Sequence, residues 1–171
     1  MTHPRTCLAI GLACLVAVAA VHGQNRQPPD PMKAISGTFT SVHKNILDMA
    51  EDFPAEKYGF KPKPEMRSFG EVIVHVFSGT TYAAKAGKGE AAQWTELDPK
   101  NYKDKAAVVA GLKKAIADAD ASMKATPATR FAASPEPWLS VIEHSAEHYG
   151  LLVAYYRLNG IVPPASRSSG N

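Results

Sequence analysis

The sequence predicts an all-α protein, a bundle of four helices in one domain. Prolines and glycines divide the chain after residue 30 into four stretches, and each repeats apolar residues at the helical spacing of three and four positions. Alternating apolar and polar patterns, which are typical of strands, are nearly missing. Four helices of this length in one small domain favour a bundle, whose sites usually form between facing helices.

The first 23 residues are predicted to be a secretory signal peptide. Arg5 provides a short basic start, residues 7–21 are almost continuously apolar, and small residues precede Gln24. The apolar run is too short for a stable membrane span. We therefore expect a periplasmic or secreted protein that has no membrane contact once the signal is removed. A retained N-terminal anchor helix is the alternative.

The composition of the remaining chain narrows the classes of function. Both cysteines, Cys7 and Cys14, lie in the predicted signal, so the mature domain depends on an apolar core and not on disulfides. Removing Arg5 leaves 18 lysines and arginines against 16 acidic residues. The lysines are dispersed, and no basic stripe with interleaved aromatic residues is present. This pattern argues against nucleic-acid binding.

The first helix is expected to follow the proline-rich segment at residues 28–31 and to end before Pro54. Its apolar positions alternate in steps of four and three, as on one face of an amphipathic helix. These positions are Ile35, Phe39, Val42, Ile46, Met49 and Phe53.

The second helix is expected to begin at Ser68, which forms a capping-box pattern with Glu71. In this motif the serine hydroxyl and the glutamate carboxylate satisfy free amide groups at the helix start. Gly87 and Gly89 end the stretch. Its apolar face consists of Phe69, Val72, Ile73, Val76, Thr80 and Ala83.

The third helix is expected over about residues 104–124, before Pro127. It is rich in alanine, which favours helix and permits close approach of a neighbouring helix. The fourth is expected to start at Ser134 and Pro135, a capping residue followed by proline at the first helical position. It ends at Asn159 and Gly160.

Three histidines form the candidate metal site: His75, His144 and His148. His144 and His148 are four residues apart, so they lie on one face of the fourth helix, and His75 lies at the edge of the apolar face of the second. If these two faces meet, three imidazoles converge and leave a coordination position for water or substrate. Imidazole ligands without cysteine favour zinc or nickel over magnesium or calcium. Spacing alone leaves open that these histidines make only ordinary hydrogen bonds.

Other polar residues near this site have simpler explanations. Glu147 precedes the second histidine of the pair, so the segment is not the zinc-protease motif H-E-x-x-H. A solvated helix carboxylate is the favoured reading of Glu147, and a supporting group or base is the alternative. His43 is predicted to be a neighbour of the site and not a ligand. Tyr82, Tyr149, Tyr155 and Tyr156 are expected to pack in the core with hydroxyls at its rim.

Four segments together resemble the DinB-like family of bacterial metal-binding four-helix bundles. They are residues 54–62, 67–76, 143–150 and 156–164, the last being the most specific. The resemblance covers nearly the whole mature chain and implies a bundle over residues 24–165. The composition of residues 166–171, rich in serine and glycine, predicts a flexible tail. The resemblance also implies a divalent metal held by one histidine of the second helix and two of the last. Those positions carry over to His75, His144 and His148.

The resemblance leaves the reaction open. We expect an exported metal-dependent hydrolase acting on a small molecule that the sequence does not identify. The alternatives are a non-enzymatic module that binds a metal or small ligand, and a thiol-dependent transferase as in related bundles. Export argues against a cellular thiol cofactor, and residues 83–89 contain no cysteine. An open coordination position would favour an enzyme, whereas closure by His43 or Glu147 would favour a binding module. The sequence also leaves a homodimer open.

Overall fold

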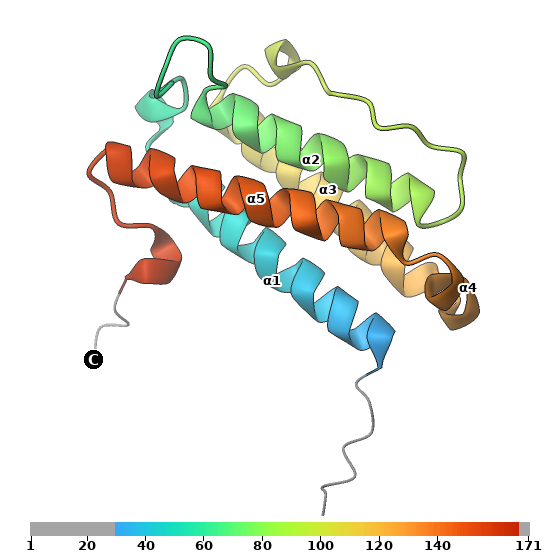
Figure 1. The fold of residues 1–171 in the computed structure, drawn as a ribbon. Helices are drawn as coiled ribbons and strands as arrows, with labels where there is room; N and C mark the ends of the chain where they lie inside the picture. Colours follow the sequence, from blue (N-terminus) through green and yellow to red (C-terminus); the bar gives the residue numbers. More distant parts are fainter. Residues whose placement is uncertain (1–29, 168–171) are drawn as a thin grey trace, which may run out of the picture.

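The structure, a computed structural model, describes residues 30–167. The predicted signal peptide lies outside the described residues. The described chain is helical and contains no strand, which confirms the predicted all-α bundle (Figure 1). Its α-helices are α1 (Pro31–Asp52), α2 (Phe69–Ala86), α3 (Lys105–Ala125), α4 (Ala128–Ala133) and α5 (Glu136–Leu158).

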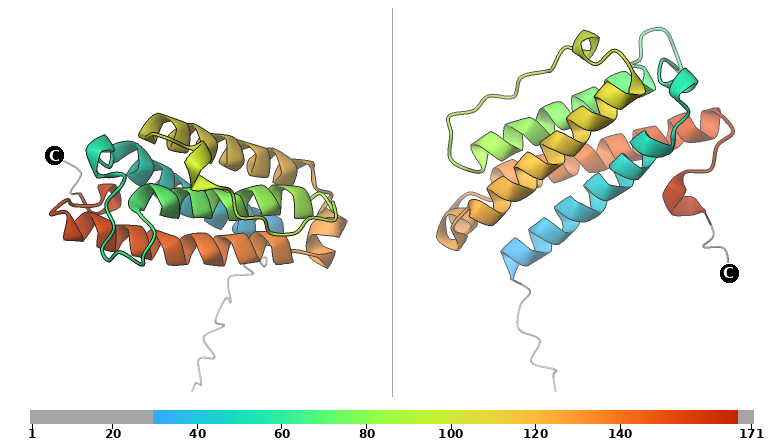
Figure 2. Two further views of the ribbon diagram at one scale, coloured as in Figure 1. Left: turned by 90° about the horizontal axis from the view of Figure 1, so that it is seen from above. Right: turned by 180° about the vertical axis from the view of Figure 1, so that it is seen from behind.

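The direction of the long helices explains the longest connection in the bundle. Helices α2 and α3 run in one direction, whereas α1 and α5 run in the other (Figures 1 and 2). Because α2 and α3 are parallel neighbours, the chain must return along the full length of α2 before α3 begins. Residues 87–104 make this crossover along the outside of α2, with one short 3-10 helix at Pro99–Asn101.

Side-chain caps fix the starts of α2 and α3. The hydroxyl of Ser68 accepts a hydrogen bond from the Glu71 amide at 3.3 Å, and the Glu71 carboxylate accepts one from the Ser68 amide at 2.6 Å. The predicted capping box of α2 is therefore confirmed. At α3, the Asp104 carboxylate accepts from the Ala107 amide at 2.8 Å. These caps satisfy amides that a helix start otherwise leaves free.

The last helix begins one residue later than predicted. Ser134 does not cap α5; it ends the additional short helix α4. Helix α5 begins at Glu136, and Pro135 before it makes no side-chain cap hydrogen bond. The short helix forms because Phe131 is buried against the bundle core. A helix of six residues is too short to display the periodic pattern from which helices are predicted.

An aromatic cluster joins α1, α2 and α5 at one end of the bundle. The rings of Phe53 and Phe69 stack with centroids 3.9 Å apart. The hydroxyl of Tyr156 donates to the Met49 carbonyl at 2.7 Å, and that of Tyr155 donates to the Arg67 carbonyl at 2.5 Å. Both tyrosines are fully buried, in agreement with their predicted core role. The cluster fixes the start of α2 against α5, and with it the spacing of the two helices that carry the histidines.

The end of the described chain is tied to α1. Of the tail predicted to be flexible, Ser166 closes a 3-10 helix, and Arg167 makes two hydrogen bonds to the Asp52 carboxylate at 2.5 and 2.8 Å. Arg167 is thus held against α1, and residues 168–171 lie outside the described residues.

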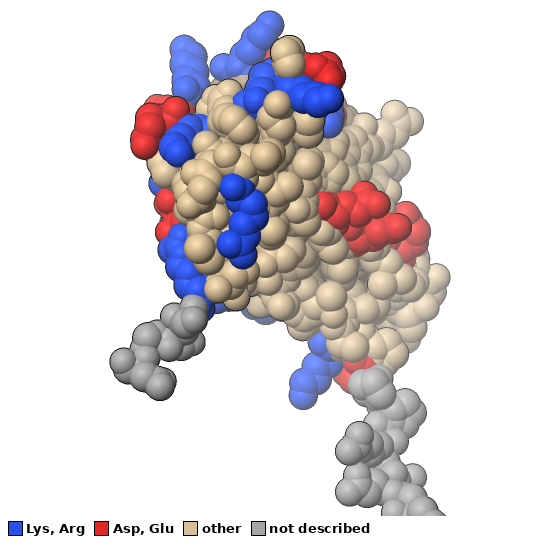
Figure 3. Space-filling view, turned by 60° about the vertical axis from the view of Figure 1, so that its left-hand side comes forward, with Lys and Arg blue, Asp and Glu red and all other residues tan. Residues whose placement is uncertain are grey.

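The surface carries charges of both signs. Figure 3 shows basic and acidic groups separated by broad uncharged areas on one face. Several lysines are paired with acids, among them Lys113 with Glu51 and Lys114 with Asp118. Within residues 30–167, none of the helices combines the length and apolar character needed to cross a membrane.

Candidate metal centre

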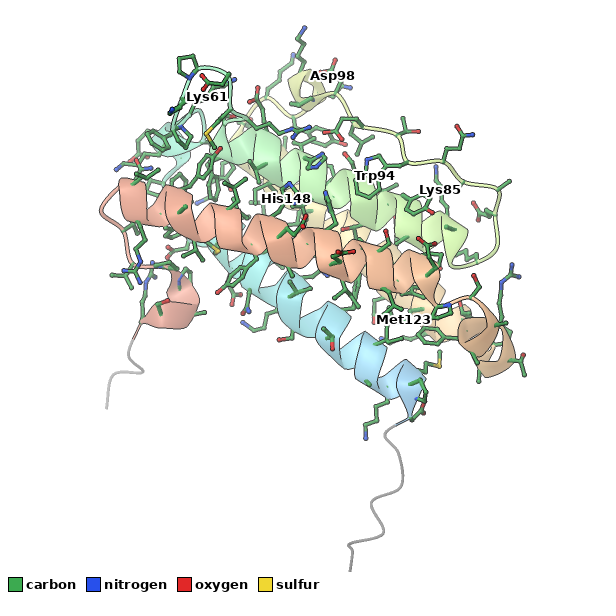
Figure 4. All side chains as sticks on the ribbon, in the orientation of Figure 1. Lys61, Lys85, Trp94, Asp98, Met123 and His148 are labelled. Carbon is green, nitrogen blue, oxygen red and sulfur yellow. The ribbon has the colours of Figure 1, made fainter. Side chains whose placement is uncertain are left out.

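Helices α2 and α5 bring the three predicted histidines together. The Nε2 atoms of His75 and His144 are 3.0 Å apart, and the ring centroid of His148 lies 4.8 Å from that of His75 and 4.4 Å from that of His144. Each residue offers a nitrogen within 4.8 Å of the other two. Figure 4 shows His148 on α5 on the side that faces α2. Within the described residues, this is the group of histidine, cysteine and acidic side chains whose geometry suits a metal ion.

Hydrogen bonds set the orientation of two of the rings. The Nδ1 atom of His148 donates to the His144 carbonyl at 2.8 Å, which leaves a free lone pair on Nε2. The Nδ1 atom of His75 lies 2.7 and 2.9 Å from the two carboxylate oxygens of Glu96. A carboxylate only accepts, so His75 donates through Nδ1 and also presents a lone pair on Nε2. Both imidazoles therefore present the same kind of ligand atom to the space between the helices.

His144 completes the set. Its Nε2 faces the Nε2 of His75, and its Nδ1 is buried without a hydrogen-bond partner in residues 30–167. In a tetrahedral site with metal–nitrogen bonds of 2.0–2.1 Å, ligand nitrogens lie about 3.3 Å apart. The 3.0 Å separation of His75 and His144 is close to that value. The donor set and its spacing thus fit a divalent transition metal.

Burial favours the uncharged forms of His144 and His148. Burial lowers the pKa of His144 to about 3, with smaller electrostatic contributions from His148, His75 and Arg67. Burial also lowers the pKa of His148, in part offset by its bond to the His144 carbonyl. A metal binds only neutral imidazole. At neutral pH, His144 and His148 therefore need not lose a proton before they bind.

The crossover between α2 and α3 supplies two residues that the sequence did not single out. The Glu96 carboxylate contacts His75. The Arg67 guanidinium lies 3.7 Å from Oε1 of the same carboxylate. The Trp94 ring meets His144 edge to face at a centroid distance of 4.7 Å. A Cβ atom at Gly79 would overlap the Trp94 ring, so the glycine permits the tryptophan to lie against α2. Figure 4 shows Trp94 beside this helix.

His43 lies next to the centre but is bonded elsewhere. It is fully buried on α1, where Nδ1 donates to the Phe39 carbonyl at 2.9 Å and Nε2 accepts from the Ser145 hydroxyl at 3.2 Å. Both nitrogens are thus engaged, as expected of a neighbour that is not a ligand. Glu147 is exposed, and its negative charge acts to raise the pKa of His148.

A large cavity lies on another side of the bundle. It has a volume of about 1050 Å³ between α1 and α3, with Phe39, Ile116 and Met123 among its lining residues. None of the three clustered histidines lines it. The candidate centre is defined by its donor atoms, because a metal site requires converging ligand atoms and does not require a large cavity.

Comparison with known proteins identifies the family of the chain. The sequence model of the DinB superfamily matches residues 38–155, a range that contains all three histidines. No curated protein matches the chain.

Proposed function

We propose that this chain, which belongs to the DinB superfamily, is an exported metal-dependent hydrolase. In this proposal His75, His144 and His148 hold one divalent transition metal, zinc or nickel. The substrate is a small molecule.

The convergence of three imidazole nitrogens is the observation that carries the proposal. These nitrogens lie within 4.8 Å of one another, they come from two helices, and proteins of the DinB-like family bind metal. Neutral imidazole is a common ligand for zinc and nickel. The cluster has three members within residues 30–167, which supports a centre with a position left for water or substrate.

The chain's own residues have separate tasks in this centre. His148 and His75 are oriented by the His144 carbonyl and the Glu96 carboxylate, so their Nε2 lone pairs point to a common centre. Trp94 covers His144 on the crossover side and restricts water there. A bound divalent metal would supply Lewis-acid chemistry, lowering the pKa of a bound water to about 7.

Export is the second part of the proposal. It is supported by the apolar run at residues 7–21 and by the small residues that precede Gln24. A location outside the cytoplasm separates the protein from cellular thiols, which argues for hydrolysis over thiol transfer.

A substrate panel tests the activity. We expect the zinc-loaded or nickel-loaded protein to hydrolyse at least one class among esters, amides and phosphoesters. Chelation of the metal should abolish the turnover, and so should the His148→Ala substitution. A fully loaded protein that turns over none of these classes would contradict hydrolysis and favour the non-enzymatic metal-binding module.

A further inference from the structure

The crossover at residues 87–104 runs along α2 and makes three specific contacts with it, although most of the crossover has no regular structure. Glu96 binds His75, the Leu97 amide donates to the Ser78 hydroxyl at 3.1 Å, and Trp94 lies over Gly79. The three α2 residues, at positions 75, 78 and 79, share one helix face. Residues 94–97, which we name the clamp segment, are therefore held against the face that presents a metal ligand.

The contact with His75 fixes which nitrogen of that ring is available. Bonds to both carboxylate oxygens, at 2.7 and 2.9 Å, hold the Nδ1 proton on the side away from His144. Without this acceptor the ring could turn about its χ2 angle or carry its proton on Nε2, where it would block the metal. Arg67, 3.7 Å from Glu96, approaches the carboxylate from the start of α2.

We propose that the clamp segment is the positioning element of the metal centre, and that Glu96 is the residue through which it acts on His75. This inference rests on the proposed metal site and assigns Glu96 no contact with the metal. A carboxylate behind a ligating imidazole fixes the tautomer and makes the free nitrogen a better donor. The connection required by the parallel arrangement of α2 and α3 is thus also part of the functional centre.

Glu96 variants test the proposal by zinc titration. Glu96→Ala should weaken zinc binding by about 10- to 100-fold, the usual effect of losing such a partner. Glu96→Gln should recover part of the affinity, because its amide oxygen can still accept the Nδ1 hydrogen bond. Glu90→Ala is the matched control, since Glu90 is exposed on the same crossover. Zinc affinity of Glu96→Ala equal to that of the wild type would overturn the proposal.

A second variant pair tests the clamp segment without changing Glu96. Gly79→Ala adds a methyl group where the Trp94 ring lies, so it should displace the segment, shift the Trp94 fluorescence to longer wavelength and weaken zinc binding. Gly37→Ala on α1 is the control, because a Cβ there meets nothing within 4 Å. Displacement of Trp94 with unchanged zinc affinity would contradict a positioning role.

Measuring the tautomer of His75 distinguishes a failure of this proposal from a failure of the metal site. Nitrogen NMR of the metal-free wild type should find the His75 proton on Nδ1, and Glu96→Ala should shift it toward Nε2. If the wild type binds no zinc but shows this change, the metal site fails, whereas the orientation of His75 by Glu96 stands. A wild-type proton on Nε2 would overturn the positioning role even if zinc binds.

Discussion

Replacing either His144 or His148 by alanine is expected to remove most of the metal from the purified protein. Each substitution takes away one of three ligand nitrogens that lie within 4.8 Å of one another. Zinc affinity should fall by more than the roughly 10- to 100-fold decrease that follows the loss of an outer partner such as Glu96. Titration of the metal-free variants with zinc measures this loss directly.

The fold should survive these substitutions. Both histidines are only partly buried, and neither belongs to the two apolar clusters of the core. The helical circular dichroism of both variants should therefore match that of the wild type. Ser140→Ala, on an earlier turn of α5, provides a control that leaves the donor set intact. Wild-type zinc affinity in either histidine variant would refute the ligand assignment.

The second large effect concerns stability at acidic pH. Burial lowers the pKa of His43 from its ordinary 6.5 to about 4 in the folded protein. Between these two values the unfolded chain binds more protons, so falling pH favours unfolding. His43 alone should cost roughly 3 kcal/mol of the free energy of unfolding across this interval. His144 and His148 shift in the same direction and add to the loss in the metal-free protein.

Denaturant unfolding of the metal-free protein at several pH values measures this dependence. The His43→Phe variant isolates the contribution of His43, because phenylalanine is of similar size and does not titrate. It should be less stable at neutral pH, since Ser145 loses its acceptor. Its stability should nevertheless fall less steeply between about pH 6.5 and pH 4. A slope as steep as that of the wild type would show that His43 is not the group responsible.

The sequence predicted the long helices because each displays its apolar face locally. The capping-box pattern of Ser68 and Glu71 predicted the start of α2, and Pro54 predicted the end of α1. It did not predict α4, whose six residues are held by the burial of Phe131 and not by a repeating pattern. Local sequence reports propensity and periodicity, whereas a short helix of this kind depends on the tertiary contact.

The candidate centre was predictable only in part for the same reason. The four-residue spacing of His144 and His148 is visible in the sequence, and His75 followed from its place on an amphipathic face. Glu96 lies 21 residues beyond His75 in a segment without periodicity. Its contact depends on the path of the crossover, which follows from the parallel arrangement of α2 and α3. Neither local spacing nor residue type indicates that path.

X-ray absorption at the metal edge of the zinc-loaded protein tests the three-histidine assignment, because it reports the atoms bound to the ion. The three-histidine centre predicts about three imidazole nitrogens at 2.0–2.1 Å, together with at least one oxygen from water. His148→Ala should reduce the imidazole count or abolish binding. A shell of oxygen atoms without imidazole scattering would mean that the metal binds elsewhere and would contradict the account.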